Sequence, residues 1–165
     1  MWTDIAFGIV LYVFPLGILP LVTRRNPAAR GVAILAMFVA PLVAALTFMI
    51  ASGRFSPFGV LVVYPFAFFP LGFWAALIAA LTTPALNYFT SYGRVVVIGT
   101  ATISGAIIGS VFMFAFVHLG AVIQPPSRPI DVSLYVVCGL SAGSIVGLLA
   151  AWLVERMPSV GRAVS

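Results

Sequence analysis

Residues 131–157 read DVSLYVVCGLSAGSIVGLLAAWLVERM, and this stretch decides which fold the chain can adopt. Its apolar run, residues 134–154, is long enough to cross the hydrocarbon core of a bilayer as one helix. Within the run, Gly139, Gly143 and Gly147 recur every four residues, so they lie on one face of that helix. A face without side chains lets a second helix come close, which is how helices associate in lipid.

A second stripe of small residues lies upstream, inside the apolar run of residues 95–122. Ala101, Gly105 and Gly109 follow the same four-residue spacing. We expect the two stripes to be used for helix packing, either against each other within one chain or between two copies of the chain in a homodimer.

The composition is that of a protein that lives in lipid. Hydrophobic residues make up 63% of the 165 residues, charged residues only 7%, and the mean hydropathy is +1.23. Soluble domains carry about 25% charged residues. The sequence therefore predicts an integral membrane protein. Because Cys138 is the single cysteine, an intrachain disulfide is excluded.

Apolar runs of membrane-crossing length occur five times along the chain. The sequence predicts an all-α, polytopic bundle in a single domain, residues 1–165, with short connections that make successive spans antiparallel neighbours. The first residues, MWTD, carry no basic segment, so we expect the first run to be a permanent span rather than a signal peptide. The five predicted spans are residues 5–22, 31–51, 58–81, 95–122 and 134–154.

Local signals predict where several of these helices begin and where they bend. Asn26 followed by Pro27 is typical of a helix start, and Asp131 is a suitable N-cap for the last span. Among the five predicted spans, only the first three contain proline, which removes a backbone donor. We expect those spans to be bent and the last two to form a straight pair; the prolines are Pro15, Pro20, Pro41, Pro65 and Pro70.

The connection over residues 82–94 allows two interpretations. Thr83 could cap a short helix that has Pro84 at its first position, ends at Gly93 and lies along the membrane surface. Alternatively, the third span continues for several more residues. The pattern does not decide between them.

The arginines predict an orientation, because cytoplasmic loops collect positive charge. With five spans, six of the eight arginines fall on one side and two on the other, which places the N-terminus outside and the C-terminus in the cytoplasm. We expect a bacterial cytoplasmic (inner) membrane. Arg24, Arg25 and Arg30 form the densest cluster, which we expect to set the topology and to contact lipid headgroups; the alternative is docking of a cytoplasmic partner.

Groups that could carry chemistry are few. No Asp, Glu, Lys or Arg lies inside a predicted span, which argues against ion coupling through a buried carboxylate and against a paired-carboxylate enzyme. Residues 139–143, GLSAG, match the nucleophile-elbow pattern of serine hydrolases, but that motif requires a strand–turn–helix. An intramembrane hydrolase with Ser141 as nucleophile and His118 as base is the remote alternative. A lone histidine does not make a metal site.

Two further patterns suggest a different function. The tetrapeptide FPLG occurs at residues 14–17 and again at 69–72, and internal repeats are common in transporters. Aromatic residues crowd the third span and either line a site for a planar ligand or simply face lipid and neighbouring helices. These residues are Tyr64, Phe66, Phe68, Phe69, Phe73 and Trp74.

Taken together, the sequence favours a non-enzymatic membrane protein that acts as a structural or accessory subunit. Its expected partners are the lipid bilayer and either another membrane protein or further copies of the chain. We expect no nucleic acid, no metal and no cofactor. The alternative is a small transporter or channel for a lipophilic or neutral solute.

Overall fold

The computed structural model describes residues 13–24, 26–123 and 131–156, and these residues are mostly helical with no strand among them. The prediction of an all-α fold is confirmed. The elements are α2 (Phe14–Thr23), α3 (Pro27–Ala51), α4 (Pro57–Ala67), the π-helical turn η2 (Phe68–Gly72), α5 (Phe73–Phe89), the 3-10 turn η3 (Thr90–Tyr92), α6 (Arg94–Ile123) and α7 (Val132–Arg156).

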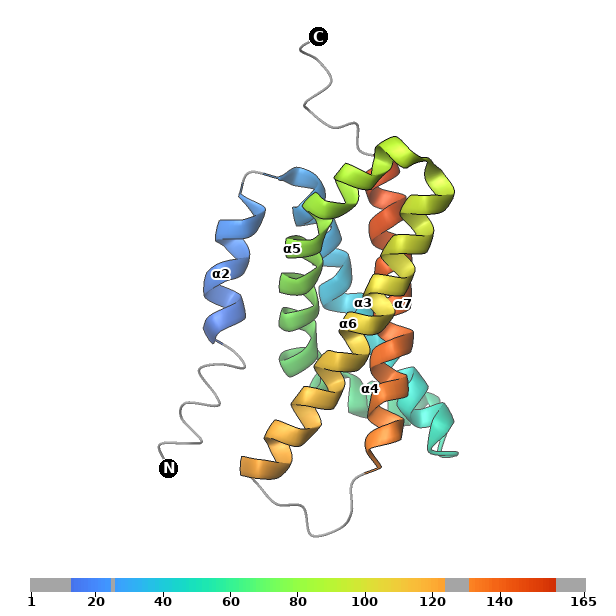
Figure 1. The fold of residues 1–165 in the computed structure, drawn as a ribbon. Coiled ribbons are helices and arrows are strands. Elements are labelled where there is room, and N and C mark those ends of the chain that lie inside the picture. The colour runs from blue at the N-terminus through green and yellow to red at the C-terminus, as the bar shows by residue number, and fades with distance from the viewer. Residues whose placement is uncertain (1–12, 25, 124–130, 157–165) are drawn as a thin grey trace.

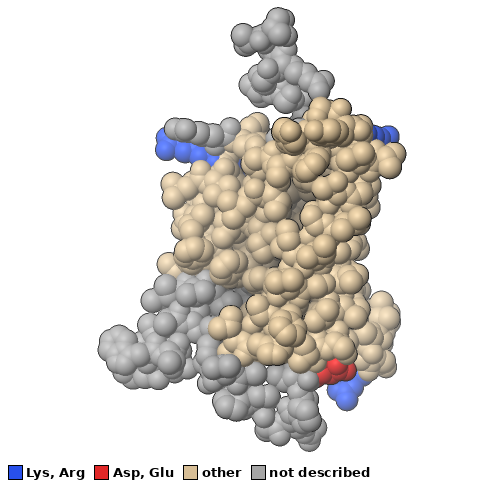
Figure 2. Space-filling view, in the orientation of Figure 1, with Lys and Arg blue, Asp and Glu red and all other residues tan. Residues whose placement is uncertain are grey.

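The long helices stand side by side, with α6 crossing α7 obliquely (Figure 1). The α2–α3 connection, the α5–α6 connection and the last turn of α7 lie at one end of the bundle. We call this the arginine end, because Arg24, Arg30, Arg94 and Arg156 belong to these segments, whereas Arg54 follows α3 at the opposite end. Figure 2 shows charged side chains only toward the two ends, with a broad uncharged band between them.

Three helices are long and apolar enough to cross a membrane: α3, α7 and, within α6, Arg94–Leu119. They correspond to the predicted spans 31–51, 134–154 and 95–122. Two further helices, α2 and the Phe73–Leu86 part of α5, are apolar but shorter. Residues 5–12 of the predicted first span lie outside the described residues, so five crossings and the orientation stay predictions.

The predicted third span, residues 58–81, is not one regular helix. It is divided into α4 and α5 by the π-helical turn η2, which contains Pro70. Proline has no backbone N–H to donate, and π-helical turns are where the regular hydrogen-bond ladder is interrupted. By contrast, α3 continues as one helix through Pro41.

After this interruption, α5 continues well beyond the predicted boundary. It includes Pro84 and ends at Phe89, and Gly93 then turns the chain into α6 with a φ of 101°. Thr83 is fully buried and donates its hydroxyl proton to the carbonyl oxygen of Ala79 at 2.6 Å, as a residue inside a helix does. Of the two interpretations of residues 82–94, a continuing third helix is therefore right, and a separate surface helix is not present.

Both predicted helix starts are confirmed. The side chain of Asn26 accepts a hydrogen bond from the backbone N–H of Ala29 at 3.1 Å, and α3 begins at Pro27. The Asp131 carboxylate accepts one from the N–H of Ser133 at 3.1 Å at the start of α7. The hydroxyl of Ser133 also donates to it and keeps the pKa of Asp131 below its ordinary value. This cap therefore weakens as the pH falls through that lowered pKa.

Alanine, rather than larger apolar residues, forms most of the interior. One face of α3 is lined with alanines at three- and four-residue spacing, and these pack against α5 and α7. Small side chains bring helix axes close together, as in other membrane bundles. Two clusters result: Ala29, Ala33, Ala76 and Ala80, and then Ala40, Ala44, Cys138 and Ala142.

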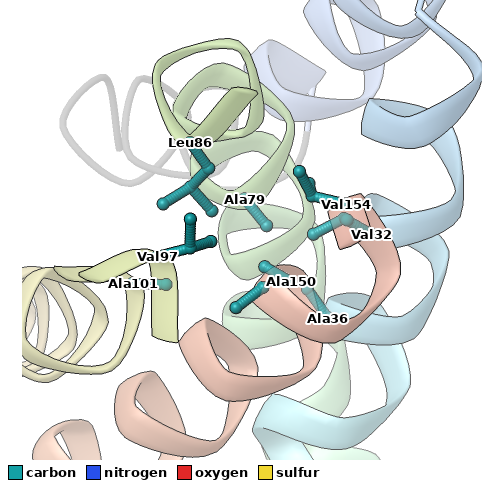
Figure 3. Close-up of a cluster of buried hydrophobic side chains, with 9 residues drawn as sticks. Val32, Ala36, Ala79, Leu86, Val97, Ala101, Ala150 and Val154 are labelled. Atoms are coloured by element: carbon teal, nitrogen blue, oxygen red, sulfur yellow. The ribbon is translucent and has the colours of Figure 1, made fainter. Parts of the chain in front are cut away.

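Four helices meet in a third cluster near the arginine end (Figure 3). Here α3, α5, α6 and α7 each contribute side chains, so this cluster fixes their mutual positions. Many other large apolar side chains are exposed on the outside of the bundle, as lipid-facing residues are. The cluster consists of Val32, Ala36, Ala79, Leu86, Val97, Ala101, Ala150, Ala151 and Val154.

Candidate functional site

The contact between α6 and α7 is made by backbone against backbone. A methyl group added at Gly105 would overlap the carbonyl oxygen of Gly143, and one added at Gly143 would overlap the carbonyl oxygen of Gly105. No residue other than glycine fits at either position without moving a helix. Gly109 and Gly139 are related in the same reciprocal way. A methyl group added at Gly147 would overlap the carbonyl oxygen of Ala101.

The structure thus brings the two predicted small-residue stripes together within one chain, and each covers the other. The helix pair is also joined at the arginine end by an ion pair between Arg94 Nε and Glu155 Oε2 at 3.1 Å. Because the Arg94 side chain is 73% exposed, this pair contributes at most about 1 kcal/mol. The close approach of the backbones is the main source of the pairing.

We predict that Gly143→Ala destabilises the protein by about 1–3 kcal/mol, the usual cost of forcing an extra methyl into a filled contact. Gly99 provides the matched control on α6, because a methyl group there would meet no atom within 4 Å. Gly99→Ala is expected to leave stability unchanged or to raise it. Unfolding by sodium dodecyl sulfate, followed by circular dichroism, measures both. Equal midpoints for the two variants would contradict the close contact.

Beside this contact lies a narrow apolar groove of about 90 Å³ between α3, α5, α6 and α7. The glycines of the two stripes lie along it, and alanines from α3 and α5 face them. Its few polar side chains are satisfied within their own helices. Ser104 donates to the carbonyl oxygen of Ala101 at 3.2 Å, and Thr82 donates to that of Ile78 at 3.0 Å. The groove therefore suits an apolar occupant rather than an ion or a polar solute.

Ser141 lies on α7 and takes part in a hydrogen bond between helices. Its hydroxyl oxygen is 2.8 Å from the hydroxyl oxygen of Thr47 on α3, and 3.0 Å from the carbonyl oxygen of Val137. Ser141 has one proton to donate. When it donates to the Val137 carbonyl, its oxygen accepts from Thr47, so both hydroxyls are satisfied. The arrangement holds α3 to α7.

His118 lies elsewhere, on the exposed surface of α6. Its Nδ1 is 2.9 Å from the carbonyl oxygen of Phe114, one turn earlier, and its ring packs on the Phe114 ring with centroids 4.1 Å apart. No hydrogen bond joins His118 to Ser141, whose partners lie on α3 and on its own helix. The structure does not assemble a serine nucleophile with this histidine as its base.

We predict that the Thr47–Ser141 bond is a modest structural contact. Thr47→Val and Ser141→Ala, combined in a double-mutant cycle, should give a coupling energy of about 0.6 kcal/mol, the average for hydrogen bonds between membrane helices. Unfolding in dodecyl sulfate measures this coupling.

In the same preparations, a fluorophosphonate should not label Ser141. Labelling that is lost in Ser141→Ala would instead favour the hydrolase.

Of the aromatic residues in the predicted third span, the side chains of Phe66 and Phe69 lie outside the described ones, and the others do not gather around one site. Tyr64 and Phe68 lie with ring centroids 5.8 Å apart, and Phe68 also contacts Phe38 on α3. Trp74 lies apart from them, between Phe14 of α2 and Phe112 of α6. Its indole N–H is buried without a hydrogen-bond partner. Each group serves as packing between a pair of helices.

The predicted headgroup arginines lie where α2 meets α3. Arg24 and Arg30 are exposed and face a crevice between these helices, whereas Arg25 lies outside the described residues. Among the described residues, no group of three or more His, Cys, Asp or Glu side chains could hold a metal ion.

Sequence reasoning missed two features that contribute to the site. Thr47 gave no signal, because a single threonine in an apolar helix has no pattern that points to a partner. The alanine face of α3 did have a signal, since its spacing is as regular as that of the glycines. It was available in the positions Ala29, Ala33, Ala36, Ala40 and Ala44.

These observations define an all-α protein with three helices able to span a membrane and a glycine-lined helix pair beside an apolar groove. Compared with models of known protein families, with curated proteins and with solved structures, the chain matches none.

Proposed function

We propose that this protein is a non-enzymatic accessory subunit, embedded in the bacterial cytoplasmic membrane by five crossings and bound to another membrane protein through α6. The first crossing would combine α2 with residues that precede it, and the third would combine α4, η2 and α5. The N-terminus would lie outside and the arginine end in the cytoplasm.

The observation that carries this proposal is the exposure of α6. Only 11% of the residues in its apolar part are buried, against 33% in α7 and 39% in α3. Its glycine face is covered by α7, and the opposite face presents large apolar side chains at four-residue spacing: Ile103, Ile107 and Val111. We call these three side chains the α6 ridge. An apolar ridge of this kind can pack against a second membrane helix.

The orientation has a direct test. Single cysteines replacing Ser56 and Ser91, at opposite ends of the bundle, are placed in a chain that carries Cys138→Ser. In intact cells, a thiol reagent that cannot cross membranes should label the cysteine at position 56 and spare the one at position 91. The reverse pattern would contradict the proposed orientation.

The partner is tested by a photoreactive amino acid placed at Ile107 in native membranes. We expect one discrete adduct with another polypeptide, because Ile107 is 58% exposed at the centre of the α6 ridge. The matched control is the same amino acid at Leu42, which is 41% exposed on α3 and should react with lipid alone.

If Ile107 gave only lipid adducts, and the protein purified in mild detergent as a lone monomer, the accessory-subunit proposal would fail. Adducts between two copies of the chain would instead identify a homo-oligomer that uses the same face of α6.

A second candidate function is favoured by one observation, the groove between α3, α5, α6 and α7. Its apolar lining supports a carrier of a lipophilic molecule and argues against a channel for a polar solute. Filling the groove with Ala142→Leu should then abolish transport of the lipophilic substrate while leaving the α6 adduct unchanged. Under the accessory-subunit proposal, this substitution affects stability only.

A further inference from the structure

We infer that the crevice between α2 and α3 at the arginine end binds one molecule of an anionic phospholipid, with its phosphate between Arg24 and Arg30 and its acyl chain against the apolar walls below them. This inference does not depend on a protein partner. It goes beyond general attraction of arginines to a charged membrane, because it assigns a single site with defined walls.

The shape of the crevice supports a lipid rather than a small anion. Its volume is about 700 Å³, and it has a basic mouth and an apolar interior. Arg24 and Arg30 lie at the mouth. Leu19 on α2 and Met37 on α3 lie deeper, and Arg30 and Met37 are separated by about 10 Å at 1.5 Å per residue. This polar-to-apolar gradient matches the passage from headgroup to acyl chain at a bilayer surface.

The packing of α3 explains why the crevice stays open. Ala29 and Ala33 are buried against Ala76 and Ala80 of α5, so α3 is held closely to α5. Helix α2 touches this cluster only through partly buried side chains and packs mainly against α5 rather than α3. Ile34, 51% exposed, therefore faces the crevice without being covered by α2.

The charges at the mouth are positive, and no acidic side chain among the described residues pairs with them. Of the described acidic residues, Glu155 pairs with Arg94 and Asp131 begins α7 at the opposite end, so neither neutralises Arg24 or Arg30. The first turn of α3 contains no acidic residue, and the positive end of its dipole lies at the same place. Figure 2 shows a basic patch at the upper left edge, on the side where α2 meets α3 in Figure 1.

The hydrogen-bonding capacity of the mouth also fits a phosphate. Guanidinium groups donate several hydrogen bonds in a fork that matches phosphate oxygens. Thr23, the other polar side chain in the crevice, already donates its proton to the carbonyl oxygen of Leu19 at 2.8 Å. The donors for an anion therefore come from the two arginines.

Native mass spectrometry of the full chain in detergent tests the inference, with dioleoyl phosphatidylglycerol and dioleoyl phosphatidylcholine as probes. We expect one phosphatidylglycerol to be retained in preference to phosphatidylcholine. An arginine near an anionic lipid contributes roughly fivefold in affinity, so Arg24→Gln with Arg30→Gln should lower retention about 25-fold. The matched control, Arg54→Gln with Arg156→Gln, removes the same charge outside the crevice and should retain the lipid.

Two further experiments show whether the bound molecule is a lipid or a free anion. Inorganic phosphate and glycerophosphoglycerol, which lack acyl chains, should not displace the bound lipid. Ile34→Ser should weaken retention roughly threefold through lost apolar contact, whereas Ile50→Ser, at an exposed position of α3 outside the crevice, should not.

Three results would overturn the inference: equal retention of the two lipids, equal loss in the two double variants, or displacement by inorganic phosphate. Circular dichroism of each variant separates lost lipid binding from lost folding.

Discussion

The contact between α6 and α7, in which two backbones touch without intervening side chains, is the constraint on which the rest of the structure depends. In lipid, apolar surface gains little by leaving one apolar environment for another, so helices associate through close packing. Glycines at matching positions on both helices permit that packing and exclude any larger residue. The mutual arrangement of α6 and α7 follows from this fit, and α7 then presents Ala142 and Ala150 to α3 and α5.

The same principle organises the remainder of the bundle. Alanines join α3 to α5 and to α7, and a hydroxyl pair, Thr47 with Ser141, adds a directional link in a core that is mainly apolar. Interiors built from small residues leave narrow spaces where packing is incomplete. Two spaces between helices support the carrier alternative and the lipid site respectively: the groove beside the glycine contact and the wider crevice between α2 and α3. The first is mainly apolar, and its hydroxyl groups are satisfied within their own helices, whereas the second has a basic mouth, so they suit different occupants.

Apolar spans and helix starts could be predicted, because a few neighbouring residues determine them. Contacts between residues far apart in the sequence could not be predicted. Spans 31–51, 95–122 and 134–154 match α3, α6 and α7 because long apolar runs and cap residues such as Asn26 and Asp131 act locally. The π-helical turn at Phe68–Gly72 and the continuation of α5 through Pro84 depend on how neighbouring helices support a chain that contains proline. The partner of Ser141 is a residue 94 positions away, and no local pattern points to it.

The most direct measurement of the central claim is chemical cross-linking of α6 to α7 in native membranes. Cysteines replace Val97 and Ala151, which are buried in the same cluster, in a chain that also carries Cys138→Ser. A short bismaleimide should join them within one chain, giving a monomer of altered mobility, whereas Ile103→Cys with Ala151→Cys should stay unjoined because Ile103 faces outward. Cross-links that form only between chains, or none with either pair, would contradict the account.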